Sequence, residues 1–172
     1  ETMCKALSEK LGIDENDVVV ASTGVIGQTL DVQPIINGIP TLISELDSSP
    51  EAGYCAAAAI MTTDTRLKQI AAEITLSGKT VKIGGMAKGS GMISPNMATM
   101  LCFITTDADI DYTVLRPLLK EVADKTFNMI SVDGDTSTND TLCVLASGKA
   151  GNARITQQNG EDYESFKAGL EY

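Results

Sequence analysis

Residues 84–99 read GGMAKGSGMISPNMAT, the stretch on which the interpretation of the whole chain depends. Its glycines permit backbone conformations closed to other residues and let the main chain approach a ligand closely. Pro95 fixes its own φ and favours an extended Ser94. We therefore expect a tight loop that delivers Thr99 to the start of a strand over residues 100–105.

Two nucleotide-binding motifs fit this stretch poorly. Gly84 and Gly89 have the spacing of a P-loop, but Ser90 stands where that motif requires Lys. A dinucleotide fingerprint fails because Ser94 stands where its last Gly is required. A binding loop that holds an anion, with Thr99 in a structural role, remains open as a non-catalytic interpretation.

Hydrophobic periodicity predicts a mixed α and β chain around this stretch. Helices are predicted over residues 1–11, 32–46, 50–60, 114–123 and 163–172. Strands are predicted over residues 18–21, 70–76, 81–83, 100–105, 130–132 and 142–146, and residues 133–140 form a polar loop. Layers of antiparallel sheet and helix are therefore favoured over a doubly wound sheet.

One of these strands has a competing interpretation. Residues 70–76 alternate apolar and polar side chains as a strand does, but residues 67–74 also fit helical spacing. Ser77-Gly78 and the alternating Val81 and Ile83 favour a β-hairpin.

The helix near residue 50 has two candidate beginnings. Ser48 with Glu51 fits a capping box, whereas Ser49 followed by Pro50 fits an N-cap with proline in the first turn. The two cannot both hold, and both predict a helix over about residues 50–60.

Charge and hydropathy exclude two classes of partner. The formal net charge is −10 and no cluster of Lys and Arg offsets it, so we expect neither nucleic acid nor an anionic membrane surface as partner. No apolar run approaches the length of a membrane span. We expect a cytoplasmic protein.

Histidine is absent and the four cysteines are scattered, at positions 4, 55, 102 and 143. This excludes zinc fingers, Ser-His-Asp triads and Cys-His dyads built within this chain. We expect four buried, reduced thiols and no metal site. The loop of residues 133–140 lacks the spacing of an EF-hand.

Thr99 could act as a nucleophile without histidine. If its hydroxyl attacked the carbonyl of Ala98 and the peptide bond broke, Thr99 would gain an α-amine with a pKa of about 7.7–8.0. That amine can serve as general base for the hydroxyl of its own residue. It is the best base available within this chain, so we expect cleavage to be required for activity.

Residues 88–93 and 95–101 resemble the signature of the ornithine acetyltransferase (glutamate N-acetyltransferase) family. Residues 22–27, 62–65 and 132–140 match that family in the same order, so the resemblance extends from about Val18 to Ala153. It implies a layered α/β/β/α sandwich of the ornithine acetyltransferase/aminopeptidase type.

The resemblance also implies an activity. Members of the family cleave themselves at the bond that matches Ala98–Thr99, and the threonine takes an acetyl group from N-acetylornithine and passes it to glutamate, in arginine biosynthesis. Some members accept acetyl-CoA as donor, and no other cofactor is expected. An N-terminal-nucleophile amidase or aminopeptidase of the same superfamily, which passes its acyl group to water, is the alternative.

Site residues follow from the same resemblance. Thr23 and Gly24 match the oxyanion hole, although the residues alone would favour a strand-end turn. Lys88 matches a substrate contact, where an exposed loop lysine is the plain alternative. Thr62 matches a second substrate contact, and Thr63 is the alternative if the match is shifted by one residue.

Cleavage would divide the chain into residues 1–98, the C-terminal part of an α chain, and residues 99–172, the N-terminal part of a β chain. Both would lie in one structural lobe. We expect a fragment of a longer protein, in which the rest of the β chain completes the substrate pocket and two α and two β chains assemble.

Overall fold

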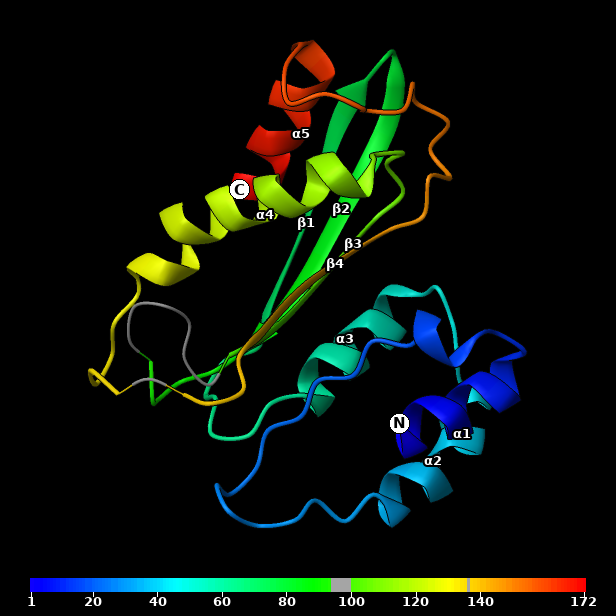
Figure 1. Cartoon of the computed structure of the whole chain (residues 1–172), viewed down its shortest axis with the longest axis vertical. Helices are drawn as coiled ribbons and strands as arrows, with labels where there is room; N and C mark the ends of the chain where they lie inside the picture. Colours follow the sequence, from blue (N-terminus) through cyan, green and yellow to red (C-terminus); the bar gives the residue numbers. More distant parts are fainter. Residues whose placement is uncertain (94–99, 136) are drawn as a thin grey trace. The chain divides into compact units, whose positions relative to one another are not determined.

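The computed structural model describes residues 1–93, 100–135 and 137–172 (Figure 1). They divide into two compact units, Glu1–Ala56 and Ala57–Tyr172. The first unit contains α1 (Thr2–Leu11), the short 3-10 helix η1 (Glu15–Asp17), α2 (Gln33–Ser44) and most of α3 (Pro50–Ala59). This division lies between Ala56 and Ala57 and is unrelated to the predicted cleavage between Ala98 and Thr99, which stays a prediction.

The helices of the first unit begin and end where local sequence signals place them. Gly12 ends α1 in the left-handed conformation, with φ of 68°, and its N–H donates to the carbonyl of Ser8. Pro40 lies inside α2 without dividing it. The Ser49 hydroxyl accepts the N–H of Ala52 at 3.3 Å, which confirms the Ser49-Pro50 beginning of α3.

The strand predicted over residues 18–21 is wrong. Residues 18–25 form neither helix nor strand, and Val19 and Val20 are about half exposed. A β-branched run becomes a strand only when a neighbour pairs with it. No described strand does so here.

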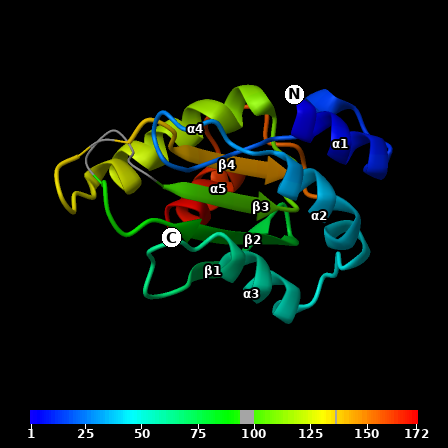
Figure 2. The same cartoon turned by 90° about the horizontal axis from the view of Figure 1, so that it is seen from below.

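The second unit is built on one sheet with the strand order β1-β2-β3-β4 (Figure 2). Its elements are β1 (Lys68–Leu76), β2 (Lys79–Lys88), β3 (Leu101–Thr106), α4 (Tyr112–Lys125), η2 (Phe127–Met129), β4 (Thr141–Ala146) and α5 (Glu161–Glu171). The first three strands are antiparallel, as predicted, but β4 runs parallel to β3. The chain returns to the sheet through α4, and a crossover through a helix gives a parallel neighbour. Residues 130–132 form no strand.

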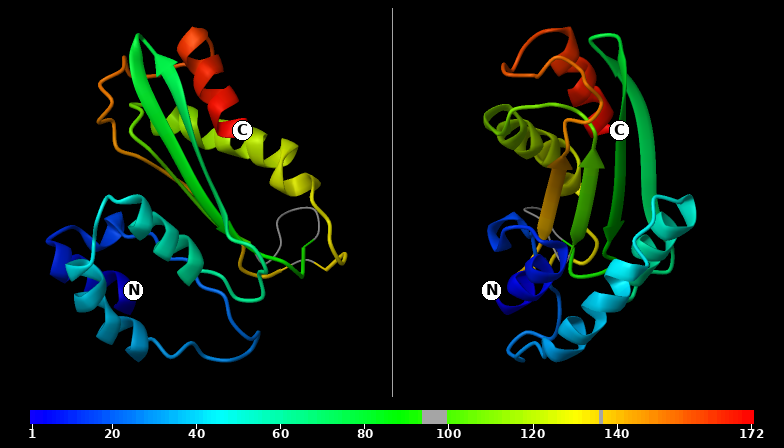
Figure 3. Two further views of the ribbon diagram at one scale, coloured as in Figure 1. Left: turned by 180° about the vertical axis from the view of Figure 1, so that it is seen from behind. Right: turned by 90° about the vertical axis from the view of Figure 1, so that its right-hand side faces the viewer.

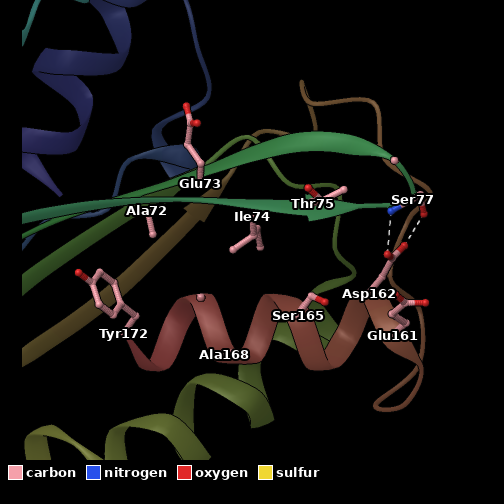
Figure 4. Close-up of a pocket in the computed structure, with 12 residues that line it drawn as sticks. Ala72, Glu73, Ile74, Thr75, Ser77, Glu161, Asp162, Ser165, Ala168 and Tyr172 are labelled. Atoms are coloured by element: carbon pink, nitrogen blue, oxygen red, sulfur yellow. Dashed lines mark hydrogen bonds between the residues drawn. The ribbon is translucent and has the colours of Figure 1, made fainter.

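The hairpin between β1 and β2 is confirmed. Ser77 and Gly78 both have positive φ, 48° and 71°, as a two-residue hairpin turn requires. The Asp162 carboxylate at the start of α5 accepts the Ser77 N–H at 2.7 Å and also its hydroxyl, so the turn is fixed to the helix (Figure 4).

The core of the second unit lies between the sheet and the two helices α4 and α5, which lie on the same face of the sheet (Figure 3). Leu118 of α4 and Phe166 of α5 are fully buried among strand side chains. A Cβ added to Gly169 would lie 3.0 Å from both Ile74 and Ile83, so α5 approaches the sheet closely and a side chain at that position requires these isoleucines to shift. The mixed α/β class is confirmed. This part of the chain supplies one β layer with its helical cover, and the second sheet of the sandwich stays a prediction.

The glycine-rich stretch begins as strand rather than loop. Residues 84–88 belong to β2 and pair with β1 on one side and β3 on the other. The expected loop therefore starts only at Gly89, which has φ of 142°. Among the described residues, no helix is long and apolar enough to span a membrane.

Candidate active site

Lys88 is the last residue of β2, and it is only 2% exposed. It pairs with Leu101, the first residue of β3 and the second residue after Thr99. A buried ammonium group costs free energy unless nearby groups compensate its charge. The plain alternative of an exposed loop lysine is therefore wrong.

A turn at residues 62–65 lies beside the same end of β2. The Asp64 carboxylate accepts the N–H of Gly89 at 2.9 Å and forms an ion pair with Lys68. The hydroxyls of Thr63 and Ser90 are 2.7 Å apart. Thr62, the predicted substrate contact, is exposed in this turn. The structure thus brings the turn and the end of β2 together.

Asp64 is fully buried as a side chain, yet its charge is stabilised. Burial raises the pKa of this carboxyl, but the hydrogen bonds from Lys68 and from the Gly89 N–H outweigh it, and the pKa lies below its ordinary value. Asp64 therefore remains ionised at neutral pH and holds the turn against the end of the strand.

Two further aspartates hold the residues on either side of the segment 94–99. Asp133 accepts the N–H groups of Met92 and Ile93, the second at 2.9 Å. Asp140 accepts the N–H of Met100 at 2.7 Å. Both come from the polar loop of residues 133–140, which the sequence suggested as a support without a defined role.

Asp140 is also within electrostatic reach of Lys88. Burial raises the pKa of the Asp140 carboxyl above its ordinary value, against the opposing effects of the Met100 N–H, the Lys88 charge and Ser137. The end of β2 and the starts of β3 and β4 therefore share one partly buried cluster of opposite charges.

The other predicted site residues lie in the first unit or outside the described residues. Thr23 and Gly24 lie in the first unit, where Thr23 is half-buried and Gly24 exposed in a segment without regular structure. Ala98 and Thr99 lie outside the described residues. Their roles stay predictions.

The cysteines and the acidic groups show no sign of other chemistry. All four thiols are free, but only Cys102 is buried and Cys55 is exposed, so the expectation of four buried thiols is wrong. Burial raises the pKa of the Cys102 thiol to about 11, which keeps it protonated. Within the described ranges, no group of three or more Cys, Asp or Glu side chains is placed to hold a metal ion.

The groove between β1 and α5, about 840 Å³ in volume, is a separate feature (Figure 4). Ala72 and Ile74 point from β1 toward α5 there, whereas Glu73 points away. None of the predicted site residues lines it.

Comparison with known proteins identifies the chain's relatives. The family model described as ArgJ family matches residues 1–172. The glutamate N-acetyltransferase of Methanocaldococcus jannaschii is 54% identical over 95% of this chain and 40% of its own length. The arginine biosynthesis bifunctional protein ArgJ of Symbiobacterium thermophilum is 57% identical over 98% of this chain and 41% of its own length. The chain therefore spans about two fifths of the length of these curated relatives.

Among solved structures, the crystal structure of ArgJ from Bacillus halodurans matches 40% of this chain and 32% of its own, with 46% identity and a TM-score of 0.38. The family match over the full length, together with identities above one half to curated relatives, shows that this chain belongs to the ArgJ family.

Proposed function

We propose that this chain carries the nucleophile side of an acetyltransferase that moves an acetyl group from N-acetylornithine to glutamate. Curated relatives at 54% and 57% identity carry the names glutamate N-acetyltransferase and bifunctional ArgJ of arginine biosynthesis. The nucleophile in this proposal is Thr99, freed by cleavage of the Ala98–Thr99 bond.

The observation that supports this proposal best is the register of β2 and β3. Lys88 pairs with Leu101, so a buried ammonium group lies beside the strand that begins directly after the predicted nucleophile. An ammonium there can bind the α-carboxylate of N-acetylornithine or glutamate through charge-assisted hydrogen bonds. Thr62 would be a second contact from the neighbouring turn.

Self-cleavage would proceed as an acyl shift. The Thr99 hydroxyl attacks the Ala98 carbonyl carbon, the peptide C–N bond breaks, and the proton lost by the hydroxyl ends on the nitrogen. This leaves an ester between Ala98 and the Thr99 side chain and a free α-amine. Water then hydrolyses the ester to a carboxylate at Ala98 and restores the Thr99 hydroxyl.

Acetyl transfer would use the same hydroxyl in two steps. The freed amine accepts the hydroxyl proton while Thr99 attacks the acetyl carbonyl, and ornithine leaves with the proton. The amine of glutamate then attacks the carbonyl carbon of the acetyl-threonine ester, the C–O bond to Thr99 breaks, and a proton from the glutamate nitrogen passes through the Thr99 α-amine to the Thr99 oxygen, which restores the hydroxyl. We propose that Thr23 and Gly24 donate hydrogen bonds to the developing oxyanion, where loss of one donor typically costs about 10²–10³-fold in rate.

An assay of the full-length protein tests this function. With N-acetylornithine and glutamate, we expect N-acetylglutamate to form faster than free acetate, and Thr99→Ala to abolish both cleavage and transfer. Acetate as the main product would instead support the amidase or aminopeptidase alternative. An intact chain that binds these substrates without turnover would support a ligand-binding domain.

The remaining properties follow the same proposal. Residues 1–98 and 99–172 would belong to an α and a β chain in an α2β2 assembly, and further β-chain residues would complete the substrate pocket. N-acetylornithine and glutamate would be the ligands, with acetyl-CoA as an additional donor to test in the same assay. A cytoplasmic location and the absence of nucleic-acid and membrane partners are part of this proposal.

A further inference from the structure

Residues 132–135 and 137–141, called here the strap, form hydrogen bonds with the main chain on both sides of the segment 94–99. On the upstream side, the Val132 N–H donates to the Ile93 carbonyl at 2.7 Å. On the downstream side, the Thr141 N–H donates to the Met100 carbonyl at 2.9 Å. Each end of the strap also carries an aspartate that binds the main chain it meets.

The upstream contact is a small nest of amide groups around one carboxylate. Met92 has φ of 55°, in the left-handed region that only a few non-glycine residues adopt. This turn of the backbone aims two successive N–H groups, those of Met92 and Ile93, at the two oxygens of Asp133. The carboxylate therefore holds a strained backbone conformation that the chain would otherwise leave.

The downstream contact involves a half-buried carboxylate. Asp140 accepts the N–H of Met100, the residue that follows Thr99, and it is electrostatically coupled to Lys88. Met100 itself is buried at 8% exposure, so its amide needs a partner within the protein. Asp140 thus fixes the main chain next to the predicted nucleophile and supplies a counter-charge for the buried ammonium.

The two contacts differ in what cleavage does to them. Once the Ala98–Thr99 bond is broken, Met92 and Ile93 belong to the upstream chain, and Asp133 no longer restrains the nucleophile. Asp140, Met100 and Thr99 remain on the same downstream chain. Asp133 can therefore restrain Thr99 through the continuous chain only before cleavage, whereas Asp140 can restrain it before and after cleavage.

We propose that Asp133 and Asp140 are positioning residues with different periods of action: Asp133 for self-cleavage alone, and Asp140 for both self-cleavage and acetyl transfer. The inference rests on the proposed function of Thr99. An acyl shift requires near-attack geometry, and a misplacement of about 1 Å can cost about 10²-fold in rate. The two aspartates fix the main chain at residues 92–93 and at residue 100, where the chain enters and leaves this segment.

The test uses the full-length protein made by cell-free synthesis, with the appearance of the two fragments followed over time. Acetyl transfer is then measured per mole of chain that begins at Thr99. We expect Asp133→Ala to slow cleavage about 10- to 100-fold, the loss typical of hydrogen bonds to a charged group, and to leave transfer per cleaved chain unchanged. We expect Asp140→Ala to slow both.

Matched variants separate positioning from a general loss of structure. Asp135→Ala removes an exposed carboxylate of the same loop and should change neither rate. Asp133→Asn and Asp140→Asn keep an oxygen acceptor and should recover part of the cleavage rate. Thermal unfolding of each cleaved variant serves as the folding control.

The outcomes distinguish this inference from the function on which it rests. A wild-type protein that stays a single chain while transferring acetyl groups overturns both. A wild type that cleaves, beside Asp133→Ala and Asp140→Ala variants that cleave equally fast, overturns the inference alone. So does a result in which Asp133→Ala slows transfer per cleaved chain as much as Asp140→Ala does.

Discussion

Lys88 is a lysine that is almost fully buried at the end of β2. It is only 2% exposed. Taking an ammonium group out of water costs on the order of several kcal/mol before any ion pair compensates it, so an apolar side chain at this position would stabilise the fold more. Asp140 offsets part of this cost from the start of β4. A buried charge that lowers stability in this way is a candidate for a binding or catalytic role, and substrate binding is the role proposed for Lys88.

Substitution of Lys88 by Met tests that role. We expect kcat/KM for N-acetylornithine to fall about 10- to 100-fold, because a hydrogen bond to a charged group contributes about 1.5–3 kcal/mol. The control is Lys82→Met on the same strand, whose side chain is 70% exposed and forms only a surface ion pair with Glu73. Equal steady-state kinetics for the wild type and the Lys88→Met variant would contradict the proposed binding role.

The residue types at the site could be predicted from the sequence, but their surroundings could not. Lys88 stood out within its motif, whereas its burial depends on pairing with β3, more than ten residues further along the chain. Asp64, Asp133 and Asp140 were not assigned roles. A carboxylate that binds main-chain N–H groups about 25 to 41 residues away leaves no local pattern in the sequence.

For helices and strands, the predictions that depended on a few adjacent residues are confirmed, and two strand predictions that depended on distant partners are wrong. The hairpin at Ser77-Gly78 and the beginning of α3 at Ser49-Pro50 depend on a few adjacent residues, and both are confirmed. The strands predicted over residues 18–21 and 130–132 are wrong because a short β-branched run needs a distant partner. The helix between β3 and β4 was predicted, but hydrophobic periodicity does not show which strands become neighbours, so the parallel pairing of β4 with β3 was not predicted.

The packing of α5 on the sheet predicts the effect of adding one methyl group. In Gly169→Ala, the new Cβ would lie 3.0 Å from Ile74 and Ile83. Overpacking of this kind costs about 1–3 kcal/mol, against a gain of about 1 kcal/mol that alanine brings to a helix. We expect the free energy of unfolding, measured in urea, to fall by up to about 2 kcal/mol.

Gly53→Ala is the matched control. Gly53 also lies inside a helix, α3, but no described atom lies within 4 Å of an added Cβ. We expect this variant to be more stable than the wild type by up to about 1 kcal/mol. If both alanine variants shifted the urea midpoint in the same direction, close packing of α5 would not be the cause.

An ion pair between α4 and α5 predicts how stability depends on pH. Hydrogen bonds from Lys125 and Lys167 lower the pKa of Glu121 to about 2, from about 4.3 in an unfolded chain. A depressed pKa in the folded state gives stability that is fully present above the unfolded value and lost as pH falls through the folded value. We therefore expect part of the stability of the wild type to disappear between about pH 5 and pH 2.

Glu121→Gln isolates this contribution. The unfolding temperature of the variant should lie below that of the wild type at neutral pH, and the two should converge near pH 2. The size of the difference should shrink in high salt because the glutamate is partly exposed. A constant difference over the whole pH range would show that Glu121 acts through packing rather than through its charge.

Over the chain as a whole, the acidic composition and the lack of histidine agree with the proposed mechanism, in which cleavage produces the catalytic amine. The net charge is −10, and Lys88 is a buried cation near the predicted site. Because the chain has no histidine, the freed amine of Thr99 is the base that the proposed mechanism uses. The chain belongs to the ArgJ family and spans about two fifths of the length of its curated relatives. The activity of the full-length relatives is therefore proposed for this chain and not shown for it.

Intact-mass and N-terminal analysis of the full-length protein, before and after incubation with N-acetylornithine, tests directly whether cleavage frees Thr99 and whether Thr99 takes the acetyl group. The account predicts two chains, one of which begins at Thr99 and gains the mass of one acetyl group on that residue, and it predicts a single unmodified chain for Thr99→Ala. An active wild-type preparation that remains a single chain, or an acetyl group found on another residue, would contradict it.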